Sequence, residues 1–97
     1  MEKINSEALE RLYEAVLKLK TTKECADFFE DICTIKEMLD ISQRLQVAEM
    51  LDNKKNYQEI TKQTGASTAT ISRVNKCLVY GSGGYKTVLE RLKTDGE

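Results

Sequence analysis

The sequence contains no histidine, no proline and no tryptophan, and only 6% of its 97 residues are aromatic. Histidine is the commonest general base and a frequent zinc ligand, so its absence removes the usual basis for acid–base catalysis and for a metal site. The sequence also lacks a nucleophile motif and a phosphate-binding loop. Tyr85, and not a Lys-Ser/Thr pair, directly follows the glycine-rich run 81–84, which we interpret as a connector. We therefore expect no enzymatic activity, no metal and no cofactor.

Few residues in this sequence break helices. Proline is absent, and four of the five glycines lie between Gly65 and Gly84. Such a distribution favours helices over most of the chain. A length of 97 residues predicts one domain, residues 1–97, with a modest aliphatic core.

The three cysteines, Cys25, Cys33 and Cys77, form no C-x-x-C motif, and their number is odd. We find no signal peptide and no apolar run of transmembrane length. This pattern predicts a cytoplasmic protein with free thiols, which we expect to be small buried side chains on apolar helix faces.

The net charge is only −1, but the charges are unevenly distributed. Residues 53–76 have a net charge of +4, whereas residues 1–31 have eight acids against five bases. The bases of 53–76 outnumber the single acid Glu59, and they are Lys54, Lys55, Lys62, Arg73 and Lys76. A local basic patch of this kind is sufficient for contact with phosphates, although alone it is also typical of an ordinary solvated face.

Apolar residues recur at three- and four-residue steps along the chain and predict six helices with no strands. Thr21-x-x-Glu24 and Thr34-x-x-Glu37 have the spacing of capping boxes and mark two helix starts. The expected all-α fold has helices at about 6–20, from Thr21 to about 32, from Thr34 to about 52, and at about 57–63, 68–79 and 85–93.

The stretch 57–80 has the features of a helix-turn-helix. Gly65 can adopt a left-handed conformation at the end of the first helix, and Ser67 can cap the second. Ile71, Val74 and Leu78 have the spacing of one buried stripe on that second helix. A turn containing glycine between two short helices is typical of this DNA-binding motif.

The face opposite that stripe begins with Thr68, Ala69, Thr70 and Ser72, which are short and include no carboxylate. In a helix-turn-helix, the N-terminal residues of the second helix contact base edges in the major groove. Short side chains allow close approach, and the absence of acids avoids repulsion by the phosphates. The predicted partner is therefore double-stranded DNA.

The first two predicted helices are more apolar than a 97-residue monomer can readily cover. We therefore expect a homodimer, in which a twofold axis presents two recognition helices to successive major grooves.

Two runs of the sequence resemble the tryptophan repressor family, and most closely its tryptophan-repressor-like branch YerC/YecD. They are TIKEMLDISQRLQVAEML (34–51) and YQEITKQTGASTATISRVNKCL (57–78), and the most specific part is the string from Gly65 to Arg73. The resemblance implies a six-helix fold, an intertwined dimer and a helix-turn-helix that reads operator DNA. It thus implies a transcription regulator, expected to be a repressor.

Matched positions imply DNA-contacting roles. The positions facing bases and adjoining phosphates are Ser67, Thr68, Ala69, Thr70 and Ser72. On the preceding helix, Gln58 and Thr61 match positions that contact the DNA backbone. We add Lys54, Lys55 and Lys62 from their charge alone.

The resemblance also implies a candidate effector pocket, formed by Thr34, Arg44, Arg73, Val74 and Cys77. Arg44 and Arg73 match the two arginines that hold tryptophan in the family's founding member. Val74 replaces a glycine and would intrude on the indole, while Cys77 replaces a serine with a weaker hydrogen-bonding group. We therefore expect an effector other than tryptophan, or a closed site. The two arginines are alternatively interpreted as ion-pairing or phosphate-contacting residues.

An alternative function is a helical protein–protein interaction module without DNA-binding activity. Helix-turn-helix folds also serve as docking platforms, and the acidic N-terminal half offers a surface for a partner. The two functions differ in the salt dependence of binding to duplex DNA.

Overall fold

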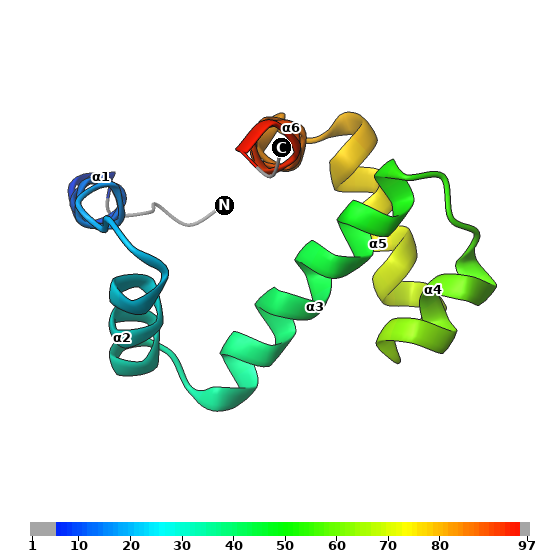
Figure 1. The fold of residues 1–97 in the computed structure, drawn as a ribbon, viewed down its shortest axis with the longest axis horizontal. Helices are drawn as coiled ribbons and strands as arrows, with labels where there is room; N and C mark the ends of the chain where they lie inside the picture. The colour runs from blue at the N-terminus through cyan, green and yellow to red at the C-terminus, as the bar shows by residue number, and fades with distance from the viewer. Residues whose placement is uncertain (1–5, 96–97) are drawn as a thin grey trace. The chain divides into compact units, whose positions relative to one another are not determined.

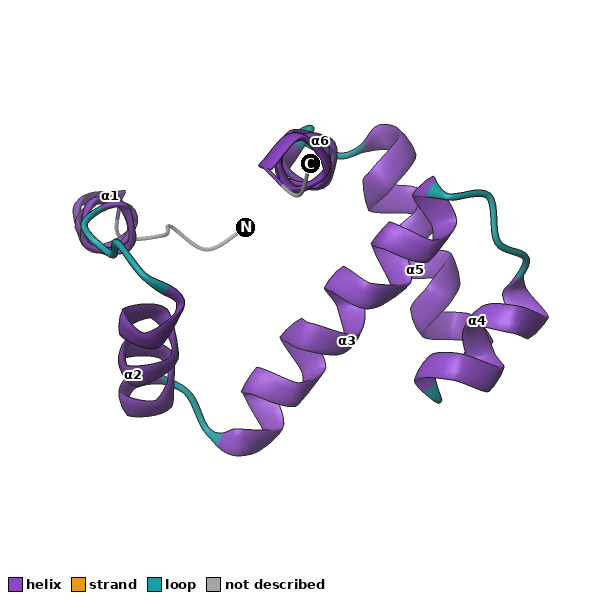
Figure 2. Ribbon diagram, in the orientation of Figure 1, coloured by secondary structure: helices purple, strands orange, loops and turns teal. Residues whose placement is uncertain are grey.

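The computed structural model describes residues 6–95, which fold into six α-helices without strands (Figures 1 and 2). The helices are α1 (Ser6–Leu17), α2 (Thr22–Ile32), α3 (Ile35–Asp52), α4 (Tyr57–Thr64), α5 (Thr68–Tyr80) and α6 (Gly84–Asp95). The all-α prediction is confirmed, and most helix ends lie within one or two residues of the expected positions.

The first helix ends earlier than the sequence predicts, at Leu17 instead of about residue 20. The amides of Lys18 and Leu19 donate to carbonyls three residues back, at 3.1 Å each, and so tighten the last turn. The amide of Lys20 then donates to the carboxylate of Glu24 at 2.7 Å, so this residue already belongs to the start of the next helix.

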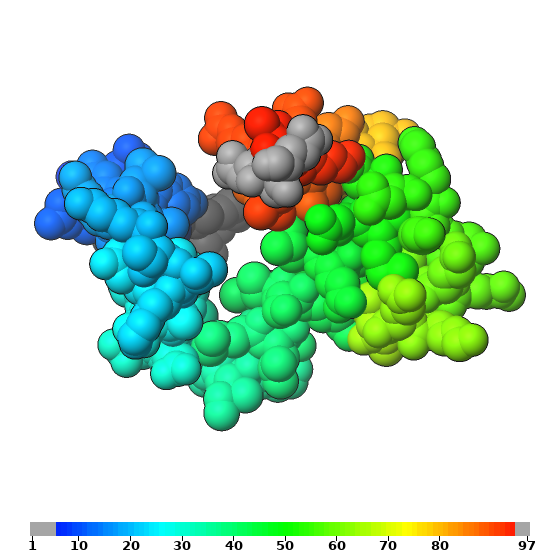
Figure 3. Space-filling model, in the orientation of Figure 1, coloured from blue at the N-terminus to red at the C-terminus, as the bar shows by residue number. Residues whose placement is uncertain are grey.

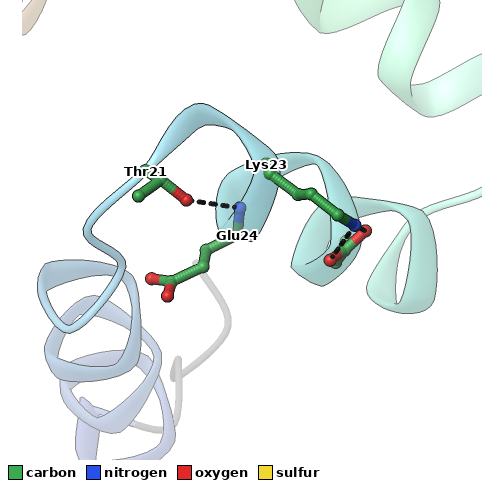
Figure 4. Close-up of polar contacts among 4 residues, drawn as sticks. Thr21, Lys23 and Glu24 are labelled. Atoms are coloured by element: carbon green, nitrogen blue, oxygen red, sulfur yellow. Dashed lines mark hydrogen bonds and ion pairs between the residues drawn. The ribbon is translucent and has the colours of Figure 1, made fainter.

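Both predicted helix caps form. The Glu24 amide donates to the hydroxyl of Thr21 at 3.0 Å, and Figure 4 shows this bond beside the Lys23–Asp27 ion pair. Thr34 and Glu37 form the full reciprocal pair, with amide-to-side-chain distances of 2.8 and 3.1 Å. Caps of this kind stabilise a helix start by about 1 kcal/mol.

The chain divides into an N-terminal unit, described over residues 6–38, and a C-terminal unit, described over residues 39–95. Within residues 6–38 no side chain is buried, although Phe28 and Phe29 pack edge to face with ring centroids 5.5 Å apart. The exposed apolar residues include Tyr13 and Leu17, the latter 81% exposed. The prediction of a single domain spanning 1–97 remains a prediction.

The C-terminal unit has an apolar core contributed by α3, α4, α5 and α6. Its buried members are Val47, Ala48, Ile60, Ala66, Ile71, Val74, Leu78 and Leu89. Figure 3 shows the yellow-green atoms of α4 packed directly against the second half of α3. This core fixes the two helices of the predicted helix-turn-helix against a longer helix, as short helices require.

The cysteines differ from expectation. Cys77 is exposed, while Cys25 and Cys33 are half-buried, so the prediction of three buried thiols was wrong. Cys77 is exposed because it lies on α5 outside the stripe of Ile71, Val74 and Leu78 that faces the core.

Among the described residues, no helix is long and apolar enough to cross a membrane, and no cluster of acidic and cysteine side chains is placed to hold a metal ion.

Candidate nucleic-acid interface

The turn between α4 and α5 adopts the conformation that its glycine predicts. Gly65 has φ +76°, in the left-handed region, and its amide donates to the Thr61 carbonyl at 2.8 Å. The hydroxyl of Thr64 donates to the Ile60 carbonyl at 2.7 Å and accepts the Ala66 amide at 3.0 Å. These bonds satisfy polar backbone groups at the end of α4 and give the turn a defined shape.

Ser67 caps α5, as predicted. Its hydroxyl accepts the Thr70 amide at 3.1 Å and also lies 3.1 Å from the Thr70 hydroxyl. Residues 68–71 therefore begin a regular helix at its first turn, and α5 has no acidic residue there. The partial positive charge of a helix N-terminus remains available to an anion.

The two faces of α5 separate as the sequence predicts. Ile71, Val74 and Leu78 are buried in the core of the C-terminal unit. On the other face Thr68, Ala69 and Ser72 are exposed, and Thr70 is half-buried. The start of α5 thus presents hydroxyls and a methyl group to the surroundings, without a carboxylate.

The other residues predicted to contact DNA lie on α4 and on the turn before it. Gln58, Thr61 and Lys62 are exposed on α4, and Lys54 and Lys55 are exposed in the turn. They belong to the same C-terminal unit as the start of α5.

Glu59, the acid of the 53–76 stretch, is engaged in a helix cap. Its carboxylate accepts the Asn56 amide at 3.0 Å, and its own amide donates to the Asn56 side chain at 2.9 Å. This capping box holds the negative charge at the N-terminus of α4, where the helix dipole favours it. The Asn-x-x-Glu spacing is the sequence signature of this box, which the prediction of helix starts did not include.

Two of the residues predicted to hold an effector line one groove. Arg44 and Cys77 border a hollow of about 580 Å³ together with residues of α3, α5, α6 and the preceding loop. The other lining residues are Ile41, Leu45, Gly81, Ser82, Gly84, Tyr85 and Val88. The walls are mainly apolar, and Arg44 contributes a guanidinium.

The remaining members of the predicted pocket do not line this groove. Val74 is only 2% exposed and belongs to the core, and Arg73 is exposed on α5. Thr34 belongs to the N-terminal unit, where it caps α3. Within residues 6–95 neither Arg44 nor Arg73 forms an ion pair. The effector pocket therefore remains a prediction.

A second hollow, of about 700 Å³, lies in the N-terminal unit, lined by Arg11, Glu14, Ala15, Lys18 and Phe28. It contains none of the residues predicted to bind DNA or an effector.

The arrangement of the helices and of the turn agrees with a comparison with known proteins. Residues 7–93 match the sequence model of the family described as Trp repressor protein. The chain belongs to the Trp repressor family. A relative, the uncharacterized protein YerC of Bacillus subtilis (strain 168), is 46% identical over 93 residues, which are 96% of this chain and 89% of that protein.

Solved structures agree with this membership. A TrpR-like protein from Eubacterium eligens ATCC 27750 is 54% identical, with a TM-score of 0.88 over 92% of each chain. A Staphylococcus aureus protein is 42% identical, with a TM-score of 0.86 over 94% of this chain and 96% of that one. The resemblance to the tryptophan repressor family and the predicted fold class are thereby confirmed.

Proposed function

We propose that this protein is a sequence-specific DNA-binding regulator of transcription, acting as a homodimer in the cytoplasm through the helix-turn-helix of α4 and α5. Membership in the Trp repressor family supports regulation, and within that family we propose repression. The observation that carries the DNA-binding part is the start of α5, where Thr68, Ala69 and Ser72 are exposed above a buried apolar stripe.

In the proposed complex, the first turns of α5 enter the major groove. The hydroxyls of Ser67, Thr68, Thr70 and Ser72 bond to base edges, and the Ala69 methyl contacts an apolar group such as the thymine methyl. Residues 67–72 include no Arg, Asn or Gln that could bind guanine or adenine through two hydrogen bonds. We therefore expect much of the specificity to come from water-mediated contacts and from DNA shape.

The proposed phosphate contacts surround this helix. Lys54, Lys55 and Lys62 carry three positive charges, which exceed the one negative charge of Glu59 between them. Gln58 and Thr61 are exposed on α4, and their polar side chains are suited to hydrogen bonds with phosphate oxygens.

Exposed apolar side chains support the proposed homodimer. Both units have them, and they are Tyr13, Leu17, Ile32, Ile35, Leu39, Ile41, Val79, Tyr80, Val88 and Leu92. Large apolar side chains in contact with water are typical of surfaces that another polypeptide covers, and this supports association. A second copy of the chain is the occupant that also supplies the second recognition helix.

Two alternatives stay open for the predicted pocket, a smaller effector than tryptophan or a closed site. Val74 fills space in the core, and Cys77 offers a thiol in place of a stronger hydrogen-bonding group. We expect such an effector in the groove beside Arg44 and Cys77, which has a volume of about 580 Å³.

The test is the binding of a fluorescently labelled random-sequence duplex, measured by anisotropy from roughly 50 to 200 mM salt. Three lysines in each subunit of a dimer predict a slope of about −5 for log K against log salt concentration. A protein-docking module would bind the duplex weakly and show almost no slope. That result would favour the interaction module over the regulator.

A further inference from the structure

The end of α4 is tied to α3 by a hydrogen bond between residues 21 positions apart in the sequence. The Gln43 side-chain amide, on α3, donates to the Thr64 carbonyl at 3.1 Å in a partly buried position. The last carbonyls of a helix have no partner within the helix, so each needs one from elsewhere. Gln43 satisfies the Thr64 carbonyl at the point where α4 ends and the turn to α5 begins.

Thr64 is fixed by its side chain as well as by its carbonyl. Its hydroxyl donates to the Ile60 carbonyl at 2.7 Å and accepts the Ala66 amide at 3.0 Å. Ala66 is buried and is followed by Ser67, which caps α5. Hydrogen bonds to the carbonyl and to the hydroxyl of Thr64 therefore link Gln43 to Ala66, the residue before the N-cap Ser67.

Apolar packing and hydrogen bonds restrain this turn in different ways. Val47 and Ala48 of α3 pack in the same core as Ile60 and Ile71, but apolar burial is not directional. Hydrogen bonds are directional, and they weaken steeply as the angle departs from linear. The bond from Gln43 to the Thr64 carbonyl therefore adds a directional restraint at the end of α4, next to the turn that leads into α5.

We propose that Gln43 is a positioning residue that sets the presentation of α5 to the bases, and so contributes to sequence selectivity more than to general DNA affinity. The inference rests on the proposed DNA-binding function. Flexible lysines hold phosphates over a range of positions, so non-specific binding tolerates a small shift of the helix. Hydrogen bonds from short hydroxyls to base edges do not tolerate it.

The experiment compares Gln43→Met with Gln46→Met. Methionine has a length and helix propensity similar to those of glutamine but lacks the amide donor. Gln46 is exposed on the same helix and provides a matched control. A preferred duplex is first obtained by selection from a random pool with the unchanged protein, and each variant is then measured on that duplex and on random duplex.

For Gln43→Met we expect the Kd for the selected duplex to rise roughly tenfold, while the Kd for random duplex changes less than about twofold. Gln46→Met should leave both unchanged. Amide exchange of Ala66, followed by NMR, should accelerate in Gln43→Met, because the Thr64 carbonyl next to the Ala66–Thr64 bond is no longer held.

If Gln43→Met only destabilised the folded protein, the result would differ. A smaller folded fraction raises the apparent Kd for the selected and for the random duplex by the same factor. An unchanged ratio of the two Kd values, with the unchanged protein binding DNA normally, would overturn the role of Gln43 and leave the proposed function intact. Failure of the unchanged protein to bind any duplex would instead refute the proposed function.

Discussion

The amide of Lys55 donates to the carbonyl of Met50 at 3.0 Å, and this bond closes the end of α3 around Lys54. Lys54 has φ +67° and is the non-glycine residue with positive φ among residues 6–95. Its own amide donates to the Leu51 carbonyl at 3.0 Å, so the two bonds form the Schellman arrangement in which glycine is usual. A lysine at this position is strained relative to glycine, and this motivates the hypothesis that its side chain contacts a phosphate.

Lys54→Gly should therefore raise the free energy of unfolding by about 0.5–1 kcal/mol, as relief of strain exceeds the added freedom of the unfolded chain. The same change should weaken DNA binding and reduce the salt slope by about 1 per subunit. Lys54→Ala is the control, since it removes the charge but keeps the strain. If Lys54→Gly bound DNA as tightly as the unchanged protein, the phosphate contact would be excluded. Thermal unfolding and anisotropy measure the two effects.

Thr70→Glu should abolish duplex binding without loss of helix. Ser67 and residue 70 have the spacing of a capping box, so glutamate at 70 can stabilise α5 by a few tenths of a kcal/mol while placing a carboxylate at the groove. The circular dichroism spectrum should be unchanged, and the labelled duplex should show no rise in anisotropy when the protein is added. Thr87→Glu, at an exposed position on α6, adds the same charge elsewhere and should still bind. Unchanged affinity in Thr70→Glu would refute the placement of α5 in the groove.

Gly65→Ala should lower the free energy of unfolding by about 1–2 kcal/mol, because an added Cβ is disfavoured at positive φ. Space is not the cause, since nothing lies within 4 Å of the position that the added Cβ would occupy. Gly84→Ala also meets open space, but at the start of α6 and without positive φ, so it should be neutral or stabilising. Thermal unfolding of the two variants tests the difference, and equal effects would contradict it.

A homodimer should have a mass of about 22 kDa by light scattering, twice the 11.0 kDa of the chain. Leu17→Glu should shift the protein toward the monomer, because Leu17 is 81% exposed in the isolated chain and would be covered by the partner. Lys18→Glu, at the neighbouring exposed position, should remain dimeric. A mass of one chain for the unchanged protein at micromolar concentration would exclude the dimer.

Tryptophan at roughly 1 mM should leave the melting temperature unchanged, because a ligand stabilises a protein only when it binds the folded state. The physical reason is that the resemblance to the family matches Val74 to a position next to the indole, and the Val74 side chain is buried in the core. A rise of several degrees in differential scanning fluorimetry would show that the core opens for this ligand.

Local signals in the sequence predicted the helix-turn-helix well. The conformation of Gly65, the cap at Ser67 and the stripe of Ile71, Val74 and Leu78 all depend on residues within one or two turns, and all three are confirmed. The end of α1 is not predictable from its own residues, because the tightened turn at Lys18 depends on the competing cap that begins α2.

Interactions between distant residues are not visible in the sequence. Val47 is fully buried, but the spacing of apolar residues on α3 does not single it out as a core residue, because that helix is apolar on several sides. The bond from Gln43 to Thr64 has no local signature, because only the packing of α3 against α4 brings the two residues together. The candidate site was therefore predictable in its turn and its helix face, but not in its support from α3.

Because no side chain in residues 6–38 is buried, we expect the stability of this unit to depend on protein concentration. If association supplies the missing cover, dilution removes it, and the melting temperature must rise with protein concentration. We therefore expect the N-terminal unit to be more open to proteolysis at low protein concentration than at high concentration.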